Sequence, residues 1–144
     1  MELAELPMRL DAGTPAFEGV TGLAATCKFV DEIGKDEIHK HEQELSFALF
    51  ESLADVPKVN SIGDQDDRTS IVSFRVEGME AHSVARILTN RGNLCLRSGF
   101  HCAELAHHNL GQRPTVRASF GMYNTLQGVE LLVATLLDVS SDLF

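Results

Sequence analysis

Two long helical segments, separated by a single glycine, occupy the first third of the chain and constrain its fold most strongly. The segment from about Pro15 to Ile33 is rich in small residues, and Gly34 after it suits a helix C-cap. Each glycine in a helix interior costs about 1 kcal/mol relative to alanine, so two of them predict close packing against another element. A second helix is predicted from about Asp36 to Ala54, with an apolar stripe formed by Ile38, Leu45, Leu49 and Leu53.

Shorter segments follow, some with the period of a strand and some with the period of a helix. Strands are predicted over 70–76, 93–97 and 115–120, and helices over 80–90 and from Thr125 onward. The last helix is capped by Thr125 and has an apolar stripe of Val129, Leu132, Val133 and Leu136. Two long helices followed by a small, mainly antiparallel sheet packed against helices predict an α+β fold.

Size and composition predict one soluble domain over residues 1–144, with an irregular lead-in over 1–15. The chain has 144 residues and a formal net charge of -9, which argues against a nucleic-acid partner. No apolar run approaches the roughly 20 residues needed to span a bilayer, and no secretory signal is recognisable. The three cysteines form no CxxC pair, so free thiols in a reducing, cytoplasmic compartment are expected.

Residues 98–114 have no clean period and are interpreted as an active-site loop containing a short helix. Within it Cys102 follows His101, with Arg97 nearby. The thiolate is the nucleophilic form of cysteine, and cationic neighbours favour it. An incidental thiol is the alternative on these residues alone. Cys27 and Cys95 are predicted to be buried in packing.

The predicted strand over 115–120 places Val116, Ala118 and Phe120 toward the core. Thr115, Arg117 and Ser119 then share the opposite face, which is predicted to be open. A guanidinium held on a strand suits bidentate capture of a carboxylate, although a solvated arginine is the alternative. A metal site is not expected, because the spacing of His101, Cys102, His107 and His108 fits no standard pattern and a fourth ligand is missing.

Three short motifs carry a resemblance to a known family. They are RSGFHCA over 97–103, TVRASFGMYNT over 115–125 and PMRLDAGTP over 7–15. Together, and in this order, they resemble segments of cysteine desulfurases, which belong to the class V aminotransferase group of fold type I enzymes dependent on pyridoxal phosphate. The resemblance covers nearly the whole chain and matches the C-terminal domain of such an enzyme.

The resemblance implies roles for five residues. Cys102 matches the loop cysteine that takes sulfur from substrate cysteine as a persulfide and leaves alanine. Arg117 matches the arginine that anchors the substrate carboxylate, and Arg97 matches a second arginine lining the site. Gly13 and Thr14 match the turn that reaches, across a homodimer, the phosphate of the partner's cofactor; an N–H group and a hydroxyl suit phosphate.

The family's cofactor lysine lies upstream of the Gly-Thr-Pro turn, and none of the four lysines, Lys28, Lys35, Lys40 and Lys58, lies in a similar motif. We therefore expect a truncated domain that binds no pyridoxal phosphate and is inactive alone. Its expected partners are a missing cofactor-binding half or a second copy of itself, together with a sulfur acceptor protein. Two alternatives stay open: a non-catalytic binding or dimerisation module, and a thiol or persulfide carrier that uses Cys102 without the cofactor.

Overall fold

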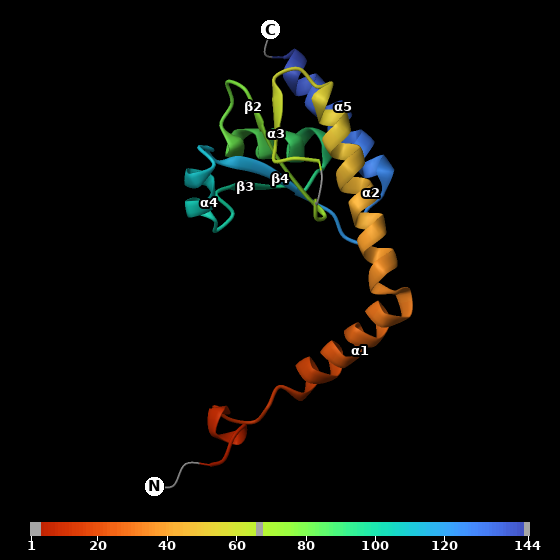
Figure 1. Ribbon diagram of the computed structural model, residues 1–144, viewed down its shortest axis with the longest axis vertical. Coiled ribbons are helices and arrows are strands. Elements are labelled where there is room, and N and C mark those ends of the chain that lie inside the picture. Colours follow the sequence, from red (N-terminus) through yellow and green to blue (C-terminus); the bar gives the residue numbers. More distant parts are fainter. Residues whose placement is uncertain (1–3, 66–67, 143–144) are drawn as a thin grey trace. The chain divides into compact units, whose positions relative to one another are not determined.

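The computed structural model describes residues 4–65 and 68–142 (Figure 1). Its internal contacts divide the chain into two units, residues 1–35 and residues 36–144. The single domain expected from the sequence stays a prediction.

The first unit contains an irregular segment, a 3-10 turn at Met8–Leu10 and helix α1 (Phe17–Ile33). The helix begins at Phe17 rather than at Pro15, because Ala16 takes the N-cap position. It ends as predicted at Gly34, whose φ of 95° is open to glycine and whose N–H donates to the Val30 carbonyl. No residue of α1 is buried, so the prediction that Cys27 is buried is wrong.

Helix α2 (Lys35–Ala54) has the predicted amphipathic pattern. Leu45, Leu49 and Leu53 recur every four residues and are buried on one face. Ser46 is buried beside them, and its hydroxyl donates to the Gln43 carbonyl at 3.0 Å, so the polar group is not left unpaired.

The sheet contains four strands, β1 (Val59–Ile62), β2 (Ile71–Val76), β3 (Arg97–Gly99) and β4 (Thr115–Ser119). Their order is β1-β2-β4-β3, and each neighbouring pair is antiparallel. The sequence did not predict β1. The strand predicted over 93–97 lies further along, at Arg97–Gly99, because Asn93 caps the preceding helix in the left-handed conformation at a φ of 52°.

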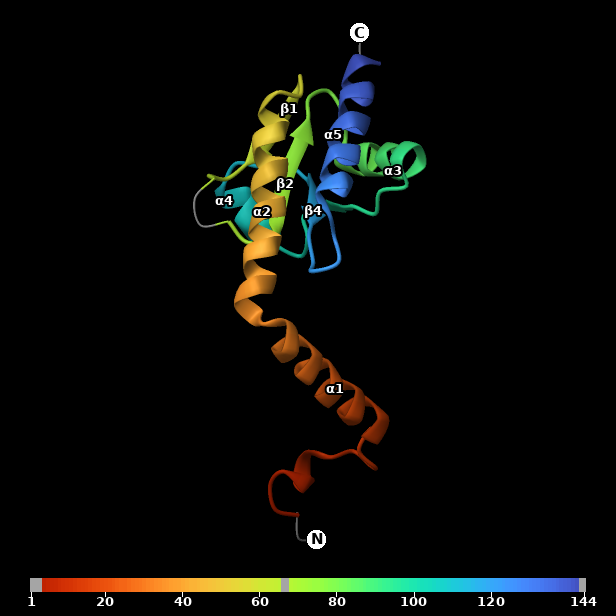
Figure 2. The same cartoon turned by 90° about the vertical axis from the view of Figure 1, so that its right-hand side faces the viewer.

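One face of the sheet packs against helices α2, α3 (Ala81–Gly92) and α5 (Leu126–Ser141), and Figure 2 shows α2 and α5 in front of the strands. Val72, Phe74 and Val116 on this face are each 0% exposed. Leucines of the three helices complete a single hydrophobic core. The predicted α+β architecture with an antiparallel sheet is confirmed.

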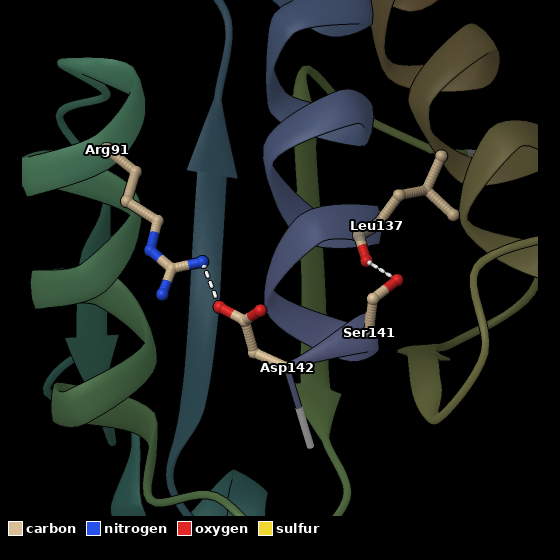
Figure 3. Close-up of polar contacts among 4 residues, drawn as sticks. All are labelled: Arg91, Leu137, Ser141 and Asp142. Carbon is tan, nitrogen blue, oxygen red and sulfur yellow. Dashed lines mark hydrogen bonds and ion pairs between the residues drawn. The ribbon is translucent and has the colours of Figure 1, made fainter. Parts of the chain in front are cut away.

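Polar contacts stabilise the two ends of α5. At its start the Thr125 hydroxyl accepts from the Gly128 N–H at 3.4 Å, which confirms the predicted cap. At its end Asp142 pairs with Arg91 of α3 at 2.6 Å, and the Ser141 hydroxyl donates to the Leu137 carbonyl (Figure 3). Within the described ranges, no helix has both the length and the apolarity needed to cross a membrane.

Candidate active site

Two arginines lie directly opposite each other at the edge of the sheet. Arg97 of β3 pairs in register with Arg117 of β4. Arg97 is exposed, whereas Arg117 is half-buried, and its buried Nε has no hydrogen-bond partner among residues 4–65 and 68–142. Like charges opposite each other on neighbouring strands destabilise a sheet through electrostatic repulsion. An anion bound between the two guanidinium groups would reduce this repulsion. Two guanidinium groups in this arrangement suit a carboxylate.

The turn after β3 presents Cys102 to solvent. Cys102 and His101 have φ values of 58° and 55°, and the Ala103 N–H closes the turn by donating to the Phe100 carbonyl at 2.8 Å. Two successive left-handed residues define a turn that favours Asn and Gly, so His and Cys here each bear a strain of roughly 1–2 kcal/mol. Such strain is concentrated at functional sites.

Gly99, between the arginine and the turn, cannot be replaced without strain. Its φ is 115°, and a Cβ there would lie 3.4 Å from Cε1 of His82. The His82 ring is also 2.8 Å from the Ser98 hydroxyl, which joins α3 to β3. The glycine therefore lets β3 pass close to α3 and turn immediately toward Cys102.

His101 and His107 both contact the hydroxyl of Thr115. Their Nε2 atoms lie 2.9 Å and 3.2 Å from Thr115 Oγ1, and His107 Nδ1 lies 3.0 Å from the Ala103 carbonyl. Burial lowers the pKa of His101, and electrostatic repulsion from the neighbouring Arg117 and from a protonated His107 acts in the same direction. His101 is therefore favoured as a neutral imidazole.

Thr115 is 1% exposed, so the prediction that it lies on an open face is wrong. Its alternation with Val116 is as predicted, and it shares a face with Arg117. However, helix α4 (Glu104–Asn109) covers this end of that face, and α4 is the short helix expected inside the loop over 98–114. A cavity of about 140 Å³ between α4 and the sheet is lined by Ile62, Ser73, Ala103, Ala106, His107, Leu110, Gln112 and Thr115.

The sequence reasoning missed the contact network around Thr115. The sequence alone indicates His107 only as a possible metal ligand, and Thr115 only as a neighbour of Arg117 on an open face. The described residues contain no group of three His, Cys, Asp or Glu side chains that could hold a metal ion. Cys95 is exposed rather than buried, because the segment before Arg97 is not a strand.

Gly13 and Thr14 belong to the first unit, where they form an exposed bend ahead of α1. Apart from Gly13 and its two chain neighbours, no described residue has an atom within 4 Å of the position that a Gly13 Cβ would take. A backbone N–H beside a threonine hydroxyl suits a phosphate group, which is the ligand that the resemblance implies for these two residues. The turn with Cys102 lies in the second unit.

The comparisons with known proteins agree with one another. The sequence matches the family "Aminotransferase class-V" over residues 1–132. The chain belongs to this family. It is 40% identical to the "Probable cysteine desulfurase 2" of Mycobacterium leprae over 93% of its own length and 38% identical to the "Probable cysteine desulfurase" of Halalkalibacterium halodurans over 89%.

Solved structures of class-V relatives show the same fold. The apo cysteine desulfurase of Thermococcus onnurineus matches 98% of this chain with a TM-score of 0.90 and 36% identity. The cysteine desulfurase CsdA of Escherichia coli matches 96% with a TM-score of 0.84 and 30% identity. The chain covers 35% and 34% of those proteins, and 32% of the Mycobacterium relative, so it spans about a third of their length.

Proposed function

We propose that this class-V chain is the sulfur-accepting part of a cysteine desulfurase. In this proposal Arg117 and Arg97 bind the carboxylate of substrate cysteine, and Cys102 takes its sulfur. The observation that carries the proposal is the pairing of the two arginines across β3 and β4, with Cys102 on the strained turn that follows β3 at once. A carboxylate anchor and a solvent-facing thiol thus lie on one short stretch of chain.

The chemistry proposed for Cys102 is attack of its thiolate on the substrate sulfur. A sulfur–sulfur bond forms and the bond between the substrate Cβ and sulfur breaks. The electron pair stays on Cβ, which takes a proton and becomes the methyl group of alanine. Pyridoxal phosphate, when bound, supplies the electron sink for this cleavage. The exposed Cys102 can then pass its persulfide sulfur to the thiol of an acceptor protein.

We further propose that the cofactor lysine comes from outside these 144 residues. Lys28 and Lys35 support this, because they form exposed ion pairs with Glu32 and Asp31 on the first unit. The phosphate would be contacted by Gly13 and Thr14. An absorbance spectrum of the chain with pyridoxal phosphate, before and after cysteine, should equal the spectrum of the same mixture without protein. A new band that shifts on adding cysteine would contradict this part of the proposal.

A chimeric enzyme tests the role of Cys102. In it this chain replaces the matching third of the Mycobacterium relative, so that the remainder supplies the cofactor lysine. The chimera should form alanine and an enzyme persulfide in equal amounts. Cys102→Ser should lower persulfide formation by about a hundredfold or more while the cofactor absorbance is unchanged.

Cys95→Ser is the matched control, because Cys95 is also an exposed free thiol of the second unit. It should retain full activity. Sulfur transfer that persists in Cys102→Ser and disappears in Cys95→Ser would overturn the assignment. Persulfide formation on Cys102 in the chain alone, from a small persulfide donor, would instead favour the carrier function that needs no cofactor.

The exposed apolar residues of α1 support a proposed interface. Phe17, Val20 and Leu23 are 66%, 62% and 65% exposed, which is unusual for three large side chains on one helix. We propose that a second copy of the chain or the cofactor-binding part of the enzyme covers them. Sedimentation should show self-association of the isolated chain, reduced by Leu23→Glu. A strictly monomeric profile at high concentration would contradict self-association.

The three free and exposed thiols also support a reducing cellular location for this enzyme, which we propose is the cytoplasm.

A further inference from the structure

Hydrogen bonds of two histidines connect the turn that presents Cys102 to Thr115 of β4. His101, immediately before the cysteine, contacts the hydroxyl of Thr115, and so does His107 of α4. His107 also contacts the carbonyl of Ala103, immediately after the cysteine. The residues on both sides of Cys102 are therefore tied to one buried hydroxyl, while Cys102 itself is exposed.

With both rings neutral, the chemistry of these groups allows one direction for each bond. A carbonyl only accepts, so Nδ1 of His107 carries a proton and donates to Ala103. In the neutral ring, Nε2 of His107 is then an acceptor, and it receives the single proton of the Thr115 hydroxyl. Thr115 has no second proton to give, so it accepts from Nε2–H of His101. The two histidines are thereby assigned opposite tautomers.

An independent observation agrees with this assignment. Nδ1 of His101 is buried and has no hydrogen-bond partner among the described residues. In the tautomer deduced above this nitrogen is a bare acceptor, whereas protonation would make it a buried donor without a partner. The charged and titratable groups that act on the ring are Arg117, His107 and Arg97, and all three disfavour a positive charge on His101.

We propose that Thr115 and His107 are positioning residues for the sulfur-accepting cysteine. Together with His101 they form a chain of hydrogen bonds, here called the relay, in which His101 donates to Thr115, Thr115 donates to His107, and His107 donates to the Ala103 carbonyl. The relay holds the strained turn in place and thereby fixes the direction in which Sγ of Cys102 points. The relay is complete only while both imidazoles are neutral. This inference rests on the proposed function, because it takes Cys102 as the sulfur acceptor.

The tautomers can be measured in the full chain without any variant. Nitrogen-15 NMR of the histidine side chains at pH 7.5 should show a proton on Nδ1 of His107 and on Nε2 of His101. Asparagine substitutions at single histidines would assign the signals. Rapidly exchanging tautomers at both rings would overturn the relay, whatever the activity of Cys102.

Thr115→Val removes the hydroxyl and keeps the buried volume, so it should abolish the fixed tautomer of His101. Thr115→Ser should restore it. Ser98→Ala is the matched control, because it breaks the neighbouring contact of Ser98 with His82 and leaves the relay intact. A loss of the His101 tautomer in Ser98→Ala, and not in Thr115→Val, would overturn the assignment.

The positioning role is tested in the chimeric enzyme. Thr115→Val should lower kcat for persulfide formation by about ten- to a hundredfold with little change in KM for cysteine, because misplacement of a nucleophile slows reaction without removing substrate contacts. Thr115→Ser should recover most of this loss. If the wild type has the fixed tautomers but Thr115→Val has an unchanged kcat, the positioning role is refuted and the proposed function is not. An active Cys102→Ser enzyme would instead refute the proposed function. If Thr115→Val does not fold, the wild-type tautomers and the kcat of Thr115→Ser decide the question.

Discussion

The two faces of the sheet carry opposite kinds of residue, although they alternate along the same strands. On β4, Val116 and Ala118 enter the core under α2, α3 and α5, whereas Thr115 and Arg117 carry the hydrogen bonds and charge of the candidate site. The face that packs against α2, α3 and α5, called the helix-covered face below, therefore supplies most of the stability. The opposite face, called the site face, can then contain destabilising features such as the paired arginines. Substitutions on the two faces should have separable effects.

The largest expected effect is on the helix-covered face. Phe74 of β2 is 0% exposed, and Phe74→Ala should lower the free energy of unfolding by about 3–5 kcal/mol through lost burial and the remaining cavity. Urea unfolding of the full chain measures it. Arg97→Ala, an exposed change on the other face that also removes the repulsion with Arg117, should change the free energy of unfolding by less than about 1 kcal/mol. Equal losses for both variants would mean that the two faces do not divide these roles.

A substitution on the site face should affect substrate binding more than stability. In the chimeric enzyme, Arg117→Lys should raise KM for cysteine at least tenfold, about 1.4 kcal/mol, because a lysine cannot reproduce the bidentate contact of a guanidinium. Its unfolding midpoint should stay close to that of the wild type. Arg86→Lys on α3 is the control and should leave KM unchanged. A KM that responds to Arg86 and not to Arg117 would place the carboxylate elsewhere.

The pH dependence of stability sharpens the comparison further. His101 has a pKa below its usual value of 6.5, so the unfolded chain binds its proton more readily than the folded chain does. Its contribution to stability is therefore complete above about pH 6.5 and is lost as the pH falls toward the folded pKa.

Urea unfolding at pH 7.5 and pH 5.5 measures this loss, and comparison with His101→Gln cancels the contributions of the other five histidines. The variant should lose less stability than the wild type over this interval. An identical or steeper loss in His101→Gln would contradict the depressed pKa.

The sequence predicts the helix-covered face better than the site face, for a physical reason. Burial of Leu45, Leu49 and Leu53 follows from a period of 3.6 residues, and the burial of Val116 and Ala118 follows from a period of two. Such periods are local. Strand β1 lacks a strong period, so it was missed, and Cys95 was wrongly placed in a buried strand.

The site face depends on contacts between distant segments. The motifs over 97–103 and 115–125 predict Arg97, Cys102 and Arg117 as site residues, and the register of β3 and β4 places the two arginines opposite each other. No local pattern, however, indicates that α4 folds over Thr115 and brings His107 to the hydroxyl contacted by His101. These contacts join Thr115 to residues fourteen and eight positions earlier in the chain. The longer one spans the turn with two left-handed residues, a conformation that the propensities of His and Cys disfavour.

The smallest expected effect concerns the ion pair of Arg91 with Asp142, which joins α3 to the end of α5 on the periphery of the helix layer (Figure 3). Their side chains are 45% and 61% exposed, so solvent screens the attraction although the 2.6 Å distance is short. Arg91→Ala should lower the free energy of unfolding by no more than about 1 kcal/mol, and 1 M salt should remove most of the difference. Urea unfolding at low and high salt measures both. A salt-insensitive loss near that of Phe74→Ala would mean that the aliphatic part of Arg91, rather than its charge, packs the helices together, and that the helix-covered face extends to this edge.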